Sequence, residues 1–421
     1  MKIIVTTSSF PVSDDDKVPA FVKDQIIELK KQYPDLDVVV HTPHNAYSDT
    51  VHTLKYQHEY YREVRYHYFW PFRWELLVGR GIMPALRQNK LLYVQIPFFV
   101  FFQFWSLRKL VRQEKPDLIY AHWFMPQAIG SALVSKRFKV PFLFTTHASD
   151  VAVLRKLPFT DKLVRWVCSR ASAYTAVSPR TASKLERTFS PQQWSDTFGK
   201  KLSVIPMGVN VSVPTLPRSA LDQTKQKYNL PEGKRYVLFL GRLAEKKGVT
   251  YLIDAMSKLD PKIAASLHLI IAGDGQLKAD LEKQAREQGV GATFTGYIHG
   301  IDKDALLQLA DYTCFPSIID SNKDAEGFPV VVMESLAAGK VVMASNVSGA
   351  EAIMKDGQDG YIFGEKSPDE IADALTRAAN LSADERTRIE GASRKLAARF
   401  DWGLIAKQHY QIFKDVVQHK K

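Results

Sequence analysis

Short apolar segments alternate with helical segments along almost the whole chain. Residues 2–7 (KIIVTT) and 37–42 (DVVVHT) are rich in β-branched residues, and a helical segment that begins near Phe21 separates them. A strand, a helix and a strand at this spacing form a βαβ unit, which implies a parallel sheet. Further strands are predicted at 117–122, 142–146, 172–177, 202–206, 236–240, 267–272, 293–295, 312–315 and 341–344. The sequence therefore predicts an α/β protein.

The length of 421 residues is too great for one ordinary core, so we expect about two domains. The polar stretch 211–233 separates two halves that each have the rhythm of a doubly wound sheet. Apolar residues make up 45% of the chain and charged residues 24%, which is typical of a soluble globular protein. Cys168 and Cys314 are too few for a disulfide framework and lack metal-ligand spacing, so a reducing cytoplasm is the expected setting. The N-terminal MKIIVTTSSF is interpreted as a first strand, not a secretory signal.

The net charge of +12 lies in the first half of the chain. Residues 1–213 hold 29 Lys and Arg against 17 Asp and Glu, whereas residues 214–421 hold 28 of each. The stretch from Tyr56 to Trp74 adds nine aromatic residues interleaved with arginines. Such a surface suits an anionic membrane or RNA, and a solvated basic surface is the plainer alternative. The apolar stretch 91–105 is too short to span a membrane, and we expect a buried helix there.

The stretch EGFPVVVMESLAAG, from Glu326 to Gly339, predicts a tight turn that opens a helix. Proline is favoured just inside a helix start, and the free N–H groups of such a start attract phosphates. Glu326 and Glu334 flank the turn eight residues apart. The hypothesis is that this turn holds a nucleotide-diphosphate sugar, with one glutamate on the sugar and the other on the ribose. An ordinary helix start with capping or solvated glutamates is the alternative.

Other polar and glycine-rich segments also follow predicted strands, where ligands bind in doubly wound sheets. Arg242 and Lys247 in GRLAEKKG could neutralise a diphosphate, or could be ordinary surface cations. The remaining candidates at strand ends are Gly273, Tyr297, Ile298, His122, His147 and Asp150. Their convergence predicts a cleft between two domains. The paired aspartates at 14/16 and 35/37 give little support for a divalent metal, and there is no Walker A sequence.

The chain resembles retaining glycosyltransferases of family 4, which have the GT-B fold. The resemblance lies in GRLAEKKGVTYLIDAM, IAGDGQL, FTGYI and EGFPVVVMESLAAGKVV of the second half. In the first half it lies in KPDLIYAHWFMPQAIG, VPFLFTTHASDV, AVSP and VIPMGVN. It implies two Rossmann-like domains that face a central cleft, an acceptor-binding domain at 1–213 and a nucleotide-sugar-binding domain at 214–395. Residues 396–421, with FDWGLIAKQHYQIFK, would form a helix that packs back on the first domain.

The resemblance also implies a role for each matching residue. Arg242 and Lys247 would hold the donor diphosphate, and Glu326 would contact the hydroxyls of the transferred sugar. Glu334 would bind the ribose, and His147 would face the reacting sugar. Backbone N–H groups of the turn would lie near the phosphates, and the segment at Tyr297 would take the base; this donor-binding set comprises Gly273, Tyr297, Ile298, Gly327, Phe328, Pro329 and Val330. His122 and Asp150 are candidates for the acceptor side.

These implications predict a metal-independent, retaining glycosyltransferase without a cofactor, whose co-substrate is a UDP- or GDP-type sugar. No carboxylate nucleophile is evident, so the acceptor hydroxyl is expected to attack from the face on which the diphosphate leaves. Residues 69–97 resemble a subgroup that acts on lipid-linked acceptors in bacterial polysaccharide synthesis. The expected partners are thus a nucleotide sugar, a lipid-linked glycan and the inner face of the cytoplasmic membrane, but no nucleic acid. The alternatives are a GT-B enzyme of another reaction type and a non-catalytic RNA- or lipid-binding module.

Overall fold

The computed structural model describes residues 1–421 except 13–17, 19, 47–53, 80, 148–159, 322, 324, 329 and 420–421, and only the backbone of 83, 84 and 87. The chain forms two compact units, of which one comprises Met1–Gly208 together with Trp402–Lys421 and the other comprises Val209–Asp401. We call them the N-terminal and the C-terminal unit. The unit boundaries lie a few residues from the positions 213/214 and 395/396 expected from the sequence.

The N-terminal unit is built on an eight-stranded sheet in the order β3-β4-β2-β1-β5-β6-β7-β8. Its pairs are parallel except for β3 with β4. The strands are β1 (Lys2–Thr6), β2 (Asp37–Pro43), β3 (Lys55–Gln57), β4 (Arg62–Tyr66), β5 (Leu118–His122), β6 (Phe142–Thr146), β7 (Ala173–Ala176) and β8 (Leu202–Val204). In β1, Ile4 faces one core while Ile3 and Val5 face the other, so the sheet is buried on both sides.

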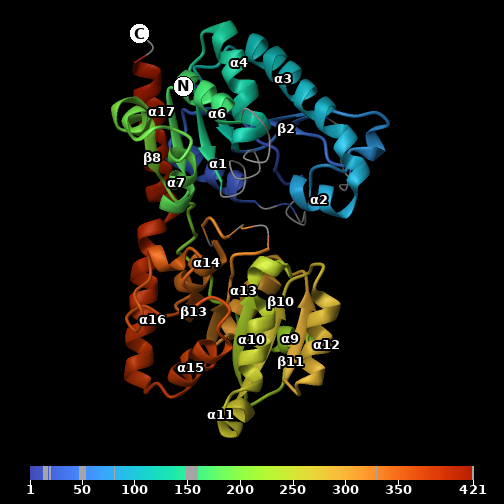
Figure 1. Cartoon of the computed structure of the whole chain (residues 1–421), viewed down its shortest axis with the longest axis vertical. Helices are drawn as coiled ribbons and strands as arrows, with labels where there is room; N and C mark the ends of the chain where they lie inside the picture. Colours follow the sequence, from blue (N-terminus) through green and yellow to red (C-terminus); the bar gives the residue numbers. More distant parts are fainter. Residues whose placement is uncertain are drawn as a thin grey trace. The chain divides into compact units, whose positions relative to one another are not determined.

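Helices cover both faces of this sheet (Figure 1). On one face α3 and α4 pack side by side, and on the other α17 packs along α1, where the rings of Tyr33 and Tyr410 stack at 3.5 Å. The helices of this unit are α1 (Phe21–Gln32), α2 (Ile82–Gln88), α3 (Gln95–Glu114), α4 (Ile129–Phe138), α6 (Thr160–Arg170), α7 (Pro179–Glu186), α8 (Pro191–Gln193) and α17 (Trp402–Gln418). Short turns of helix lie at η1 (Phe72–Trp74), η2 (Lys90–Val94), η3 (Phe124–Ala128), η4 (Trp194–Phe198) and η5 (Gly199–Lys201).

The prediction that the helix at 91–105 is buried is wrong. In α3 one stripe is buried, with Phe99, Gln103 and Leu107 against the core. A second stripe at helical spacing is exposed, and Trp105, for example, keeps 51% of its surface in contact with solvent. The nearby loop exposes more aromatic side chains, and Gln95 ties it to α3 by donating to the Trp74 carbonyl at 2.6 Å. We call this surface the aromatic surface; its residues are Trp70, Phe72, Trp74, Tyr93, Phe98, Phe101, Phe102 and Trp105.

The C-terminal unit holds a six-stranded sheet in the order β11-β10-β9-β12-β13-β14, parallel in every described pair. Its strands are β9 (Arg235–Leu240), β10 (Leu267–Ala272), β11 (Ala292–Gly296), β12 (Tyr312–Phe315), β13 (Val341–Ser345) and β14 (Tyr361–Phe363). Together with the N-terminal sheet, this arrangement confirms the predicted α/β fold of two doubly wound sheets.

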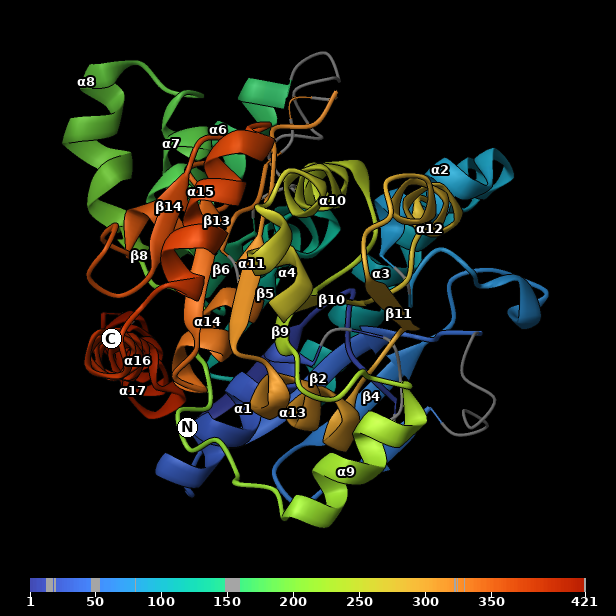
Figure 2. The same ribbon diagram turned by 90° about the horizontal axis from the view of Figure 1, so that it is seen from below.

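Two helical layers sandwich the sheet of the C-terminal unit (Figure 2). Val237 and Phe239 of β9 face α10, α12 and α15, whereas Leu238 and Leu240 face α13, α14 and α16. The helices are α9 (Arg218–Lys227), α10 (Val249–Ser257), α11 (Pro261–Ser266), α12 (Lys278–Glu287), α13 (Gly300–Leu309), α14 (Val330–Ala337), α15 (Pro368–Ala379) and α16 (Ala383–Ala397), with short turns at η6 (Glu245–Lys247), η7 (Ala350–Ala352) and η8 (Ala398–Phe400). The helix expected at 396–421 begins at Trp402 as α17, and η8 separates it from α16.

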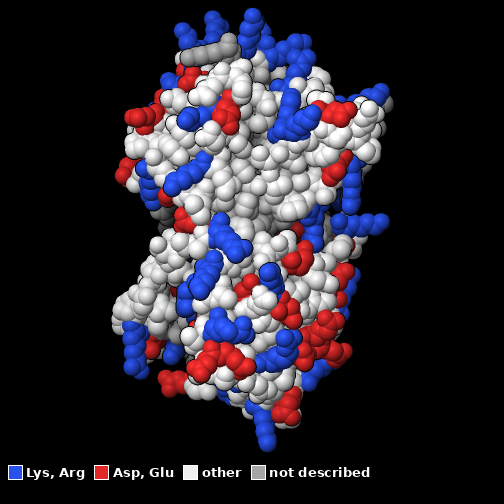
Figure 3. All heavy atoms as spheres, turned by 90° about the vertical axis from the view of Figure 1, so that its left-hand side faces the viewer, with Lys and Arg blue, Asp and Glu red and all other residues white. Residues whose placement is uncertain are grey.

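Charge is distributed differently on the two units. On the face that carries α17, basic side chains line the upper rim of the N-terminal unit, whereas both signs are mixed on the C-terminal unit (Figure 3). This matches the basic excess of residues 1–213 in the sequence.

Candidate functional site

The carboxyl ends of three neighbouring strands of the C-terminal unit meet through glycines. Gly241 follows β9 and Gly273 follows β10, and the N–H of Gly241 donates to the Ala272 carbonyl at 2.9 Å. A Cβ atom on Gly273 would lie 1.8 Å from the Gly241 carbonyl oxygen, so a side chain has no room there. Gly273 in turn bridges to Gly296, the last residue of β11. These strand ends form a backbone surface that a ligand can approach closely.

Cationic side chains of the loop after β9 gather around Glu326. The Lys247 Nζ lies 3.3 Å from Glu326 Oε1, and the Lys246 Nζ lies 3.6 Å from the same oxygen. Burial alone would raise the pKa of the Glu326 carboxyl, but Lys247 and Lys246 outweigh it and hold this pKa below its usual value. For Arg242, desolvation lowers the pKa of the guanidinium while the nearby Glu326 raises it. Arg242, Lys247 and Glu326, predicted as one set, are therefore brought together.

The loop that carries Glu326 is fastened to the lysine loop by its backbone. The N–H of Ile318 donates to the Lys246 carbonyl at 2.9 Å, and Ser321 donates to the Glu245 carboxylate through both its N–H and its hydroxyl. Gly248 has a φ of +64°, and a Cβ atom there would lie 1.9 Å from the Pro316 carbonyl oxygen. Only glycine permits both the left-handed backbone and the close approach of the two loops.

The remaining donor-binding candidates differ in how accessible they are. Glu334, on α14, is paired with Lys303 of α13 at 2.8 Å, so its ion pair in this structure is with a residue that the sequence reasoning did not single out. Gly327 is buried, and Phe328 packs its ring against Phe400 at 5.7 Å. The Val330 N–H donates to the Phe328 carbonyl at 3.2 Å and is thus engaged within the turn. Pro329 lies outside the described residues.

The segment expected to take the base begins directly after Gly296. The Tyr297 side chain is 40% exposed and lies 5.8 Å from the His299 ring, so a planar group could stack there. The Ile298 side chain, in contrast, is buried in the core with α13 and α14. A contact between Ile298 and a ligand would therefore have to use its backbone.

In the N-terminal unit, two predicted histidines lie at the carboxyl ends of β5 and β6. His122 Nδ1 and His147 Nε2 are 3.3 Å apart, and the His147 ring packs between Phe21 and Trp123. His122 is fully buried and lies beside His147, and its assignment to the acceptor side stays a prediction. Asp150 lies outside the described residues. Burial, and then the nearby His409, lowers the pKa of His147, so this imidazole is neutral at physiological pH.

The buried histidines of this unit predict a loss of stability in acid. Burial lowers the pKa of His41 to about 3 and that of His409 to about 4, and it lowers the pKa of His122 as well. The unfolded chain, with histidine pKa values near 6.5, binds more protons below that pH than the folded chain does. We expect the contribution of these histidines to the free energy of unfolding to be greatest above about pH 6.5. At lower pH the free energy of unfolding should decrease by about 1.4 kcal/mol per pH unit for each buried histidine.

Denaturant unfolding at pH 7, 6 and 5 measures this slope. His409→Gln should make the slope shallower by the contribution of one buried histidine. His419→Gln, at an exposed position of the same unit, should leave the slope unchanged. Equal slopes for the wild type and His409→Gln would contradict the argument.

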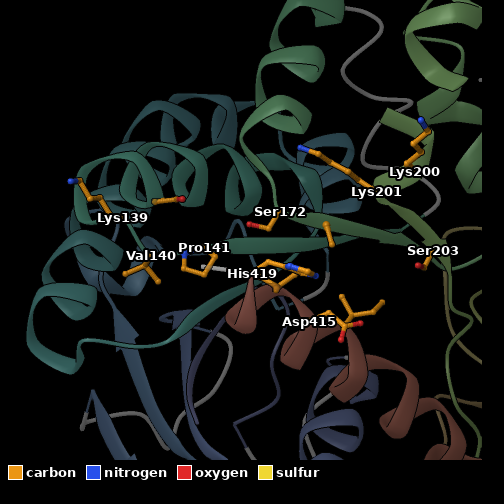
Figure 4. A pocket seen from close by; sticks show the side chains of 13 residues that line it. Lys139, Val140, Pro141, Ser172, Lys200, Lys201, Ser203, Asp415 and His419 are labelled. Atoms are coloured by element: carbon orange, nitrogen blue, oxygen red, sulfur yellow. The ribbon is translucent and has the colours of Figure 1, made fainter. Parts of the chain in front are cut away.

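A cavity of about 500 Å³ lies elsewhere in the N-terminal unit (Figure 4). Its lining includes Pro141 before β6, Ser172 before β7 and Lys201 before β8, together with Asp415 and His419 near the end of α17. It therefore lies at the amino ends of the strands, whereas His122 and His147 lie at the carboxyl ends of β5 and β6. The cavity is not part of the candidate site.

Sequence reasoning missed two residues, one in each unit, that lie beside predicted ones. Lys246 shares Glu326 with Lys247, and its position next to Lys247 in the motif was an available signal. His409 lies on α17 and interacts electrostatically with His122 and His147. Nothing in the sequence around His409 indicates that it approaches two strand ends more than 250 residues earlier.

Comparison with known proteins shows to which family the chain belongs. Residues 222–396 match the family Glycosyl transferases group 1, and residues 80–213 match Glycosyltransferase Family 4. A phosphatidyl-myo-inositol mannosyltransferase of Mycobacterium leprae is 30% identical over 284 residues, which cover 66% of this chain and 67% of that protein. The chain is a family 4 glycosyltransferase of the GT-B fold. The predicted family is thereby confirmed.

Full-length relatives agree with this membership. TuaC of Bacillus subtilis, a glycosyltransferase named for teichuronic acid biosynthesis, is 27% identical over 414 residues, 98% of each chain. Among solved structures, Anabaena HepE in complex with UDP is similar to this family 4 glycosyltransferase with a TM-score of 0.71 and 18% identity, covering 98% of this chain and 99% of that one. The structural likeness supports the GT-B fold of the glycosyltransferase.

Proposed function

We propose that the protein is a retaining enzyme that transfers a hexose-type sugar from a UDP- or GDP-sugar to a hydroxyl of a lipid-linked glycan. The observation that carries the proposal is the gathering of Arg242, Lys246 and Lys247 around Glu326 at the carboxyl ends of the C-terminal strands. Cations beside close-packed glycine backbone suit a diphosphate, and a largely buried carboxylate suits sugar hydroxyls. Bound UDP and UDP-glucose in the structures of HepE, and the teichuronic acid and phosphatidylinositol named for relatives, support this donor and acceptor class.

The proposed reaction needs charge stabilisation more than a nucleophile. The bond from the anomeric carbon to the diphosphate oxygen breaks as the acceptor oxygen bonds to the same carbon from the same face. The proton of the acceptor hydroxyl passes to an oxygen of the leaving diphosphate. Arg242 and Lys247 stabilise the negative charge that develops there, so the donor needs no metal. Glu326 orients the sugar, Glu334 exchanges its pairing with Lys303 for the ribose, and His147 contacts the reacting sugar.

Transfer and donor binding can be tested together. The protein is incubated with UDP- and GDP-sugars in a thermal-shift panel, because a donor at 100 times its dissociation constant stabilises the fold by about 2.7 kcal/mol. The stabilising donor is then supplied with a lipid-linked acceptor, with and without EDTA, and the anomeric configuration of the product is read by NMR. Retention that is insensitive to EDTA supports the proposal. Inversion, or a donor bound without transfer, contradicts it.

We further propose that the N-terminal unit docks on the anionic, cytoplasmic face of a membrane through the aromatic surface. The stretch Lys90–Glu114 is long and apolar enough to cross a membrane by length and composition. However, α3 buries Phe99, Gln103 and Leu107 in the core and packs along α4, which suits a helix lying at the interface. Phe98, Phe101 and Trp105 are spaced to face one side, and Arg108 lies 5.1 Å from the Trp105 ring.

Binding to vesicles is expected to depend on this stripe. Burying a large apolar side chain contributes about 1.5–3 kcal/mol, so the triple variant Phe98→Ser, Phe101→Ser, Trp105→Ser should lose binding by tens-fold or more. Leu404→Ser, at an exposed apolar position on α17, is the matched control and should bind normally. Co-flotation with anionic and with zwitterionic vesicles at low and high salt measures the apolar and the electrostatic contributions to binding. Equal flotation of the triple variant and the wild type would contradict the docking surface.

A further inference from the structure

Three potential metal ligands converge at a place that the glycosyl-transfer proposal does not use. His44 directly follows β2 and His67 directly follows β4, and these strands pair in parallel with Pro43 opposite Tyr66. The register therefore places the two histidines side by side at the carboxyl edge of the N-terminal sheet. Glu75 comes from a third segment, directly after η1, and its carbonyl accepts the Ala46 N–H at 3.2 Å.

The Glu75 carboxylate is completely buried and has different partners on its two oxygens. Its Oε1 accepts the backbone N–H of Tyr68 at 2.5 Å and that of Phe69 at 3.0 Å. Its Oε2 meets the Nδ1 atoms of both histidines, closely for His44 and at 2.9 Å for His67. The backbone donors thus fix the carboxylate so that its second oxygen faces two imidazole nitrogens, and the ligand atoms of the three residues all lie within 4.8 Å of one another.

Packing holds both imidazoles in this orientation. The His67 ring stacks on Phe72 with ring centroids 3.6 Å apart and an angle of 12° between the planes. The His44 ring lies 4.5 Å from the His67 ring, and the backbone N–H of His44 donates to the Tyr66 carbonyl at 2.8 Å. A site whose ligands are held by their neighbours in this way loses little side-chain entropy when an ion binds.

The charge of the cluster calls for a cation. The ion pairs described for Glu75 are both with histidines, so no lysine or arginine takes part in the described ion pairs of this carboxylate. A buried carboxylate without a compensating charge is costly. A divalent ion supplies that charge, and an imidazole–imidazole–carboxylate set is a ligand combination that binds Zn²⁺ and leaves a fourth position open.

We propose that His44 Nδ1, His67 Nδ1 and Glu75 Oε2 bind a divalent transition-metal ion of the Zn²⁺ class. Metal–ligand bonds of about 2.0–2.2 Å require the three side chains to move slightly apart from their present hydrogen-bond distances. Each imidazole then binds through a deprotonated Nδ1 and carries its proton on Nε2. His67 keeps 26% of its side chain exposed, so the fourth position is accessible to water from that side. The hydrogen bonds to Glu75 Oε1 act as the outer support of the site.

The ion would fix the aromatic surface. Glu75 and His67 bracket the loop that exposes Trp70, Phe72 and Trp74, and His44 directly follows β2 of the sheet. One ion bound by all three residues therefore pins this loop to the sheet. The inference does not depend on donor binding or transfer, which are proposed for the C-terminal unit.

Metal content and a spectroscopic probe test the site on the full chain. After dialysis against a chelator, the protein is titrated with Zn²⁺ in a calorimeter and with Co²⁺ in a spectrophotometer, where tetrahedral coordination gives visible absorption. Glu75→Gln keeps a carbonyl for the two backbone donors and an amide for the histidines but removes the charge. His67→Gln removes one ligand. His58→Gln is the matched control, because His58 lies 3.2 Å from the Glu63 carboxylate in another histidine–glutamate pair of the same sheet.

The expected result is one equivalent of Zn²⁺ bound by the wild type and by His58→Gln, with at least about a hundredfold weaker binding in Glu75→Gln and His67→Gln. Zn²⁺ should raise the melting temperature of the wild type and not that of Glu75→Gln. If the wild type and both ligand variants bind Zn²⁺ and Co²⁺ equally, the cluster is a hydrogen-bonded one and the proposal is overturned. Circular dichroism of each variant verifies that lost binding does not come from unfolding.

Discussion

Lys247→Ala is expected to lower the rate of sugar transfer by about 10²–10³-fold, because one preorganised donor to the leaving diphosphate is removed. The fold should survive, since Glu326 keeps Lys246 at 3.6 Å as a partner for its charge. The measurement is single-turnover transfer with a saturating donor, beside the thermal unfolding curve of the variant. The loss should appear in the chemical step more than in donor affinity, because the charge on the diphosphate grows in the transition state.

Lys246→Ala is the matched control for this prediction. Lys246 carries the same charge, comes from the same loop and contacts the same Glu326 oxygen, but it lies farther from that oxygen and is more exposed. Its removal should cost clearly less than the removal of Lys247. Equal rates for Lys247→Ala and the wild type, or a larger loss in Lys246→Ala, would contradict the assigned role of Lys247.

Gly248→Ala is expected to have the largest effect on stability. The methyl group would meet the Pro316 carbonyl 1.9 Å away, and alanine at a φ of +64° adds a left-handed penalty of about 1–2 kcal/mol. Relief of the clash typically costs another 1–3 kcal/mol or so, which gives a total of about 2–5 kcal/mol. Moving the 316 loop also moves Glu326 away from Lys247, so stabilisation by the donor in a thermal-shift assay should fall as well.

Gly289→Ala separates these two terms. Gly289 has nearly the same φ of +66°, but a Cβ atom there would have nothing within 4 Å. Its substitution should therefore cost only the left-handed penalty and leave the response to donor intact. Denaturant unfolding of both variants gives the difference, and similar losses for the two would show that the contact with Pro316 is not tight.

Apolar strands in the sequence predicted most of both sheets. β1, β5, β10 and β13 are rich in apolar residues, as parallel strands buried on both faces require. β4 was missed because it reads REVRY and has the composition of a surface segment. In the structure Glu63 and Arg65 are both buried and pair with each other at 2.5 Å, so two charges neutralise one another inside the sheet. No pattern of hydrophobicity predicts such a pairing.

The candidate site was predicted unevenly for a related reason. Arg242, Lys247 and Glu326 lie in motifs whose residue types suit their chemistry, and the structure brings them together. The partner of Glu334 and the burial of His122 depend on which helices pack against these residues, and sequence spacing does not specify that packing. α3 shows the same limit, because an apolar composition on every side does not tell which face another element will cover.

The return of the last helix into the N-terminal unit has a consequence for biosynthesis. Phe413 of α17 contacts Tyr120 of β5 at a ring distance of 5.2 Å and completes the core beside β1. During translation α17 must therefore emerge from the ribosome before the first-made sheet can close this core, although all eight strands of that sheet have emerged long before. Until then that apolar surface is open, so a nascent chain halted before Trp402 is a natural substrate for chaperones and proteases.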